Sequence, residues 1–62
     1  MAQMYYLYVK DIDDEEFHKY IDQPMYKSEC SEIIQNNHYA ALADLREFGI
    51  DTHSEFKMVA IN

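Results

Sequence analysis

The sequence predicts a small two-layer α+β domain, a β-α-α-β unit in which a two-stranded antiparallel sheet packs on two helices. The 62 residues allow one domain, over residues 1–62, and no second one. Both ends of the chain are rich in aromatic and β-branched residues, and apolar residues recur at helical spacing between them. A two-stranded sheet is marginal and leaves both edges open, so we expect a homodimer in which a second copy extends the sheet.

The first strand is expected over residues 3–10, which contain no Gly or Pro. Alternation gives the strand one face with Tyr5, Leu7 and Val9 and another with Met4, Tyr6 and Tyr8. A strand with one solvated face alternates polar and apolar residues, and this one does not. Both of its faces are therefore expected to need cover, from the chain itself or from a partner.

An acidic run over residues 11–16 follows the first strand and predicts the start of a helix over residues 14–22. Asp13 and Glu16 have the spacing of a capping box, and carboxylates suit the first turn of a helix. Phe17, Tyr20 and Ile21 would form the apolar stripe of this helix. Pro24 would end it, because the residue before a proline disfavours helical geometry.

The second helix is expected over residues 29–48, with Ser28 as its N-cap and Gly49 just beyond its end. Its apolar stripe is interrupted by two polar residues, Asn37 and His38. The stripe consists of Cys30, Ile33, Ile34, Ala41, Leu42, Leu45 and Phe48. We expect Leu42 and Leu45 in the core, and Ile50 packed back on Leu45. The second strand is expected over residues 52–61, with Phe56, Met58 and Ala60 on one face.

The composition argues against several classes of function. Twelve acidic residues stand against five basic ones, a net charge of −7 at pH 7, and the cations are scattered along the sequence. Direct nucleic-acid binding is therefore not expected, because phosphate contacts need clustered Lys and Arg. No apolar run reaches the length of a membrane span, and no signal peptide is evident. A single cysteine favours a reducing compartment, so we expect a cytoplasmic protein.

The candidate catalytic and metal-binding residues fit plainer roles. A calcium loop starting at Asp11 would need glycine where Glu16 stands, and a glutamate where Asp22 stands. Asp14, His18 and Asp22 could share one helix face and ligate a cation, but that spacing is equally typical of a solvated face. Cys30 lies on the apolar stripe and is expected to be a small buried hydrophobe. No hydrolase motif or phosphate-binding loop is present, so we expect no enzyme, no cofactor and no metal.

Tyrosine and acidic residues carry the main functional hypothesis. Six tyrosines occur in the chain, and tyrosine is enriched at protein interfaces, while a strongly acidic surface attracts basic partners. We therefore expect a non-enzymatic protein-binding module that docks on a basic, nucleic-acid-handling protein and inhibits or modulates it, as small acidic inhibitors of phage and mobile elements do. Spaced carboxylates can imitate phosphates. The expected partner-binding residues are Tyr6, Tyr8, Asp11, Asp13, Asp14 and Glu15.

Two other function classes stay open. The chain could be a small dimeric regulator or an antitoxin-like module that binds another small protein, in which case the aromatic strand face would serve the homodimer. Less favoured is a minor enzyme or a metal-binding protein, for which copurifying metal would be the sign.

Overall fold

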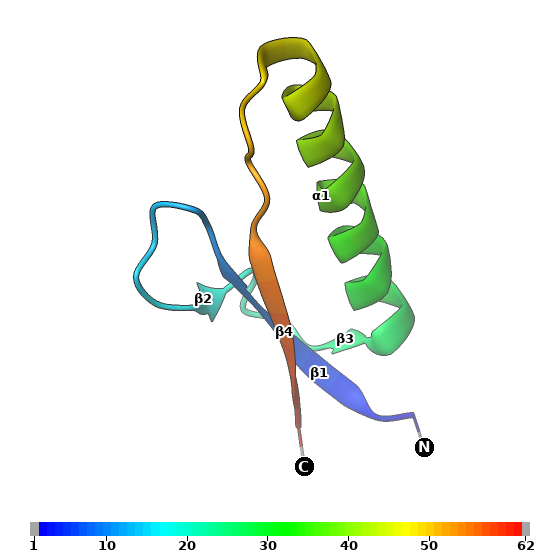
Figure 1. The fold of residues 1–62 in the computed structure, drawn as a ribbon. Coiled ribbons are helices and arrows are strands. Elements are labelled where there is room, and N and C mark those ends of the chain that lie inside the picture. Colours follow the sequence, from blue (N-terminus) through cyan, green and yellow to red (C-terminus); the bar gives the residue numbers. More distant parts are fainter. Residues whose placement is uncertain (1, 62) are drawn as a thin grey trace.

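The computed structural model describes residues 2–61, and one long helix lies across an antiparallel sheet (Figure 1). The elements follow in the order β1 (Met4–Lys10), β2 (His18–Lys19), β3 (Met25–Tyr26), α1 (Lys27–Phe48) and β4 (Glu55–Ala60). The α+β class is therefore confirmed. The expected pair of helices and the two-stranded sheet are wrong, since the described part of the chain has one helix and a four-stranded sheet.

Strand β1 is the centre of the sheet. On one side it pairs with β4 along its length, from Tyr5 opposite Ala60 to Lys10 opposite Glu55. On the other side its edge is shared by two short strands: β2 pairs at Tyr8 and Val9, and β3 pairs at Met4 and Tyr5. All three pairings are antiparallel. Both edges of β1 are thus covered within a single copy.

The helix expected over residues 14–22 is absent from the structure. The chain instead turns after β1, where the Asp14 N–H donates to the Asp11 carbonyl at 2.9 Å, and it returns as β2. The Tyr20 N–H then donates to the Leu7 carbonyl at 2.8 Å. A helix of nine residues is marginal by itself because its nucleation is costly. The open edge of β1 offers the same backbone groups ready-made partners, so the acidic run forms a loop and not a helix start.

Helix α1 begins and ends for different reasons. It starts at Lys27, directly after β3, so Ser28 is inside the helix and is not the expected N-cap. The Glu29 Oε1 atom accepts a hydrogen bond from the Tyr26 N–H at 3.0 Å and satisfies one donor at this end. At the other end Gly49 has φ 67°, and its N–H donates to the Leu45 carbonyl at 3.0 Å. The predicted end at residue 48 is confirmed.

The core is small and lies under the first half of α1. Leu7 and Cys30 are fully buried and Met25 nearly so. The half-buried side chains packed against these three are Tyr5, Ile33, Ile34 and Phe56. The core face of β1, predicted from its alternation, is therefore confirmed, as is the burial of Cys30. Met25 lies in none of the expected elements, and its burial follows from the pairing of β3 with β1.

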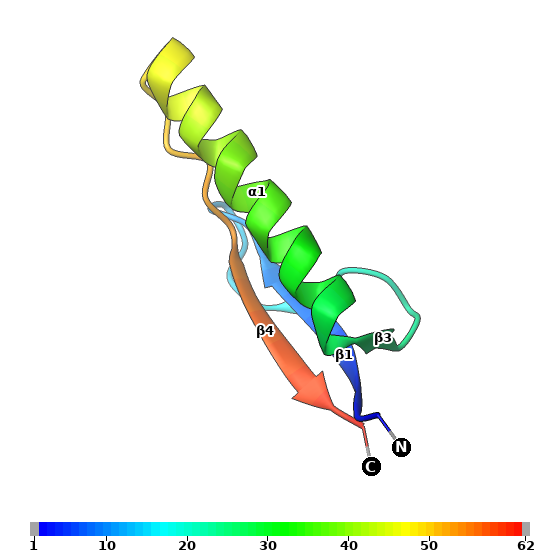
Figure 2. The same cartoon turned by 90° about the vertical axis from the view of Figure 1, so that its right-hand side faces the viewer.

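Helix α1 is longer than the sheet that supports it. Its 22 residues span about 33 Å at 1.5 Å per residue, and its last turns extend past the strands (Figure 2). Leu45 is 45% exposed, Phe48 67% and Ile50 57%. The expectation that Leu45 belongs to the core is therefore wrong in the single chain, because no strand reaches that level. Leu42 is half-buried. Within residues 2–61, no helix is both long enough and apolar enough to cross a membrane.

Candidate functional site

The two tyrosines expected to bind a partner lie on the sheet face that points away from α1. Tyr6 is opposite Val59, and Tyr8 is opposite Lys57. Both are half-buried, because lysine side chains lie over their rings. The Lys19 ammonium is 4.1 Å from the centre of the Tyr6 ring, and the Lys57 ammonium is 5.7 Å from that of Tyr8. These are cation–π contacts.

Phe17 completes this face from the loop before β2. Its ring centre is 4.6 Å from the Lys57 ammonium and 5.5 Å from that of Lys10. Three of the five basic residues therefore gather here, although they are scattered in the sequence. Two of them also form ion pairs, Lys10 with Glu55 at 3.3 Å and Lys19 with Asp22 at 3.1 Å. The tyrosine–lysine face is defined by Tyr6, Tyr8, Phe17, Lys10, Lys19 and Lys57.

The expected acidic residues lie elsewhere, on the loop after β1, which is beside the segment that returns from the end of α1 to β4 (Figure 1). Two hydrogen bonds hold three segments together there. The Ser54 hydroxyl donates to Asp11 Oδ1 at 2.6 Å, and the Thr52 hydroxyl donates to Asp44 Oδ2 at 3.0 Å. Residues 50–54 thereby connect the loop after β1 with the last turns of α1. We call this region the acidic end, and its carboxylates are those of Asp11, Asp13, Asp14, Glu15, Glu16, Asp44, Glu47 and Asp51.

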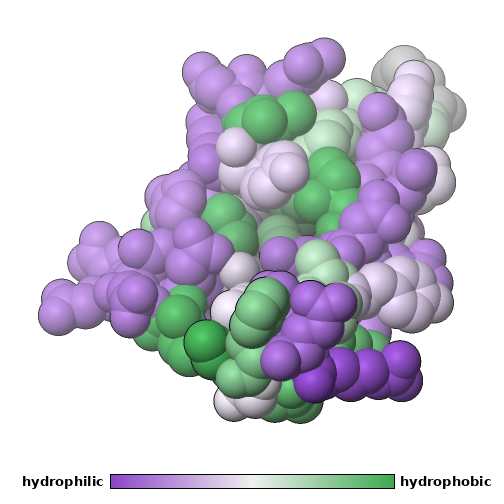
Figure 3. Space-filling model, turned by 90° about the horizontal axis from the view of Figure 1, so that it is seen from above, coloured by the Kyte–Doolittle hydropathy of each residue, from purple (hydrophilic) through white to green (hydrophobic). Residues whose placement is uncertain are grey.

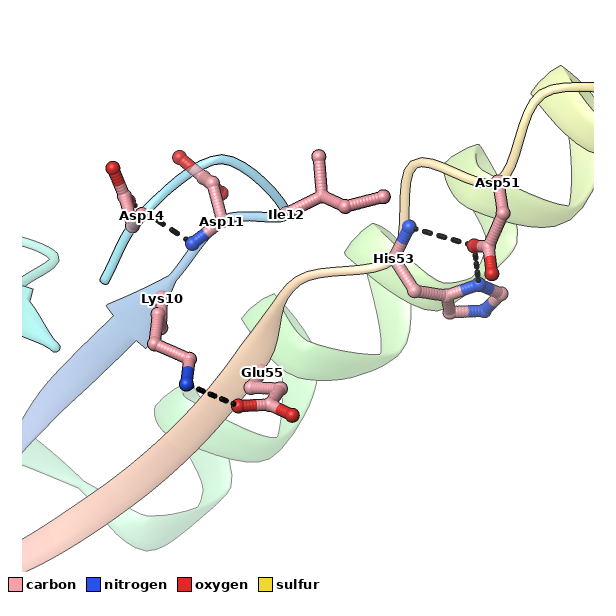
Figure 4. A pocket seen from close by; sticks show the side chains of 7 residues that line it. All are labelled: Lys10, Asp11, Ile12, Asp14, Asp51, His53 and Glu55. Carbon is pink, nitrogen blue, oxygen red and sulfur yellow. Dashed lines mark hydrogen bonds and ion pairs between the residues drawn. The ribbon is translucent and has the colours of Figure 1, made fainter. Parts of the chain in front are cut away.

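A shallow pocket of about 340 Å³ opens between the loop and residues 51–55 (Figure 4). The carboxylates of Asp11, Asp14, Asp51 and Glu55 line it, and Lys10, which also lines it, pairs with Glu55. Ile12 is a further lining residue and is 68% exposed. Asp14 Oδ2 also accepts a hydrogen bond from the Asp11 N–H at 3.0 Å, which fixes the turn. The pocket is a charged surface hollow beside an apolar side chain.

A short chain of polar contacts anchors residues 51–53 to the helix. Asp51 Oδ1 accepts the His53 backbone N–H at 3.0 Å and lies 2.7 Å from His53 Nδ1. The His53 Nε2 atom is 3.2 Å from Nδ1 of His38 on α1. The hydrogen bonds from the backbone and the ring of His53 hold the pKa of the Asp51 carboxyl below its ordinary value. His38 thus has a structural contact with the segment that returns to the sheet.

The side chains considered for catalysis or metal binding are not assembled into such a site. Cys30 is fully buried under α1, and burial, helped by the charge of Glu29, raises the pKa of its thiol. Asp14 and His18 lie 3.6 Å apart, but Asp22 pairs with Lys19. Over residues 2–61, no three His, Cys, Asp or Glu side chains are grouped as a metal site.

The structure therefore divides the expected partner-binding residues between two surfaces. Asp11 and Asp14 meet Asp51 and Glu55 in the pocket, while Asp13 and Glu15 are exposed on the same loop. Tyr6 and Tyr8 lie on the tyrosine–lysine face, which meets that loop at Phe17. Sequence reasoning missed the carboxylates that the fold adds, Asp44, Asp51 and Glu55. Ile12, an isolated apolar residue inside an acidic run, is 68% exposed, and its place among carboxylates was the one sequence signal for that exposure.

Seen from the end where α1 closes, the surface carries hydrophobic side chains among hydrophilic ones (Figure 3). The strongly exposed apolar side chains near this end are Ile12, Leu45, Phe48 and Ile50. Fold and surfaces together define a small acidic α+β protein with one carboxylate-rich end and one lysine-rich sheet face. Comparison of the chain with family models, with characterised proteins and with solved structures finds no match.

Proposed function

We propose that this protein is a non-enzymatic binding module whose acidic end docks on a basic, nucleic-acid-handling protein and modulates it. One observation carries the proposal: hydrogen bonds from Ser54 and Thr52 hold carboxylates of three separate segments together beside exposed apolar side chains. A surface that only confers solubility has no need of such links, nor of large apolar side chains in contact with water.

The two kinds of side chain have separate tasks in binding. Carboxylates on an exposed loop attract a basic partner, which raises the association rate and makes it depend on salt. Ile12, Phe48 and Ile50 would supply the buried anchors that slow dissociation. A surface that binds nucleic acid presents Lys and Arg spaced for phosphates, and carboxylates held in fixed positions can occupy those places.

The basic partner would contact the acidic end and not the surface around Tyr6 and Tyr8. The ammonium groups of Lys19 and Lys57 lie over these two rings, so a basic partner would meet like charge there. A partner role for the two tyrosines stays a prediction, which dissociation rates of a Tyr6→Ala variant from the purified partner would test.

The test compares two variants that each lose two negative charges. Asp13→Asn with Glu15→Gln neutralises the exposed loop and leaves the Asp11–Asp14 turn intact. Asp22→Asn with Glu32→Gln is the control, because both residues are exposed and lie outside the acidic end; Asp22 also pairs with Lys19, so this control reports any effect of that ion pair as well. Proteins that wild-type protein retains from a bacterial lysate at low salt and releases at high salt are identified and purified. Binding kinetics of both variants are then measured with the purified partner at two salt concentrations.

We expect the loop variant to associate more slowly, with a flatter salt dependence, while the control behaves like the wild type. Phe48→Ala should mainly raise the dissociation rate, by about 30-fold for a hot spot of about 2 kcal/mol. Equal association rates for the loop variant and the control would refute the proposal. So would a partner that binds no nucleic acid and carries no basic surface; a small toxin in that position would favour the antitoxin-like alternative.

A further inference from the structure

The outer edge of β4 is the longest strand edge left unpaired in the described part of the chain. In the described part of the chain, β4 pairs with β1 on one side and with nothing on the other. We propose that a second copy of this chain pairs antiparallel with this edge, so that two β4 strands meet at a two-fold axis at Met58. The two four-stranded sheets would then form one continuous sheet.

The hydrogen-bond pattern shows which residues are available on that edge. The Ile61 N–H donates to the Met4 carbonyl at 3.0 Å. In an antiparallel pair, successive residues of a strand direct their backbone groups alternately toward the partner strand and away from it. Lys57 and Val59 therefore bond toward β1 with Ile61. The backbone groups of Phe56, Met58 and Ala60 point to the open edge.

A two-fold axis at Met58 makes these three residues complementary to their own copies. Met58 is then opposite Met58 of the second copy, and Phe56 is opposite Ala60, which pairs a large side chain with a small one. On the other sheet face Lys57 is opposite Val59, so no like charges lie directly across from each other. Like charges in that position would be destabilising.

The sheet face beside this edge is also short of cover. Helix α1 packs chiefly on β1 and β3, and the register places Phe56, Met58 and Ala60 on the helix side of the sheet. Met58 is 36% exposed, and Ala60 is exposed as well. A second copy placed at this edge would shield the apolar atoms of both β4 strands at the same time.

The size of the exposed surface agrees with a missing partner of this kind. The chain exposes 4862 Å², whereas a compact protein of 7.4 kDa exposes about 4,200 Å². The radius of gyration is 12.9 Å, against about 10.6 Å for a compact chain of this length. The exposed area in excess of the compact value is close to the area of about 800 Å² that each partner buries in a standard interface.

The two-fold axis provides the test, because residue 58 would meet itself. Met58→Lys and Met58→Glu each place two like charges at the axis, and Met58 is 36% exposed in the single chain, so the fold should tolerate both. We expect wild-type protein to sediment at twice the 7.4 kDa chain mass at micromolar concentrations, and each variant at the single mass. An equimolar mixture of the two variants should return to the double mass, as a Lys–Glu heterodimer.

The matched controls are Ile12→Lys and Ile12→Glu, which change an exposed apolar residue at the acidic end and should stay dimeric. These controls also distinguish this inference from the proposed function, because binding of the basic partner needs Ile12, whereas pairing of the two copies needs Met58. Far-ultraviolet circular dichroism checks that all variants are folded. If the Met58 variants unfold, chemical synthesis of the chain with an N-methyl group at Met58 removes the edge donor alone and should give a monomer. A monomeric wild type, dimeric Met58 variants, or a mixture that stays monomeric would each overturn the inference.

Discussion

Leu7 and Leu45 show how differently two leucines contribute in a small core. Leu7 is fully buried at the centre of β1 and contacts the cluster formed with Met25 and Cys30, whereas Leu45 is 45% exposed. The side chain of Leu7 is enclosed between the sheet and α1. A leucine on the last turns of α1 has no strand beneath it.

We therefore expect Leu7→Ala to lower the free energy of unfolding by about 2–5 kcal/mol, because it leaves a cavity. Leu45→Ala should cost no more than about 1 kcal/mol, as surface substitutions do. Urea unfolding at matched protein concentration measures both. A larger loss for Leu45→Ala than for Leu7→Ala would mean that Leu45 is buried in the assembled protein.

Asp51 links local hydrogen bonding to the pH dependence of stability. Because its pKa in the folded protein lies below the ordinary value of 3.8, its contribution to stability is present above that value. The contribution is lost as the pH falls through the lowered pKa. The advantage of wild type over Asp51→Asn in unfolding free energy should therefore be smaller at the acid end of a titration from pH 7 to pH 2 than at its neutral end. A difference that stays the same over this range would contradict this assignment.

At the level of elements, the long helix was the most predictable part of the fold. Its apolar residues recur over many turns. Gly49 marks its end, because the left-handed backbone conformation found there is unfavourable for other residues. The stop at Phe48 was therefore readable from sequence. The start was misplaced by two residues, because the pairing of β3 with β1 decides where the chain enters the helix.

Gly49 offers a direct measure of this helix end. A β-carbon added to it would meet no atom within 4 Å, so only the left-handed backbone, φ 67°, opposes substitution. We expect Gly49→Ala to destabilise the protein by about 1 kcal/mol, and Gly49→Asn by less, since asparagine tolerates this conformation better. Thermal unfolding of both variants tests the order. An unchanged stability for Gly49→Ala would show that the helix end relaxes.

The short strands β2 and β3 could not be predicted from their own residues. Each has two residues, too few for any periodicity, and each exists because the edge of β1 accepts it. The same long-range effect converted residues 14–22 from a plausible helix into a loop and a strand. Local patterns such as Asp13 with Glu16 indicate helix starts in general, and here tertiary pairing outweighs them.

For the whole molecule, charge is separated in a way that the linear sequence hides. Carboxylates of the loop after β1 and of α1 are linked through residues 52–54, whereas Lys10, Lys19 and Lys57 share the outer sheet face. The candidate site was predictable as far as the run at Asp11–Glu16. Its union with Asp44 and Asp51 depends on contacts such as Ser54 with Asp11, 43 positions apart in the chain, and no spacing rule anticipates them.

The elongated shape can be measured in solution. The longest dimension is 43 Å, against 24 and 13 Å for the others. Small-angle scattering of Met58→Lys should give a radius of gyration consistent with the 12.9 Å of the single chain and not with the about 10.6 Å of a compact one. A value near the compact figure would mean that the end of α1 folds back on the sheet.

The pairing of β1 with β4 has a consequence for how the protein is made. The two strands come from opposite ends of the chain, so Tyr5 meets Ala60 only after a loop of more than 50 residues has closed. Such long-range closure slows folding relative to a helical protein of this size. During translation, β1 leaves the ribosome well before β4, the strand with which it makes its longest pairing. Its apolar residues, Leu7 and Val9, lack their contact with Phe56 for that interval, in which a chaperone can bind the nascent chain.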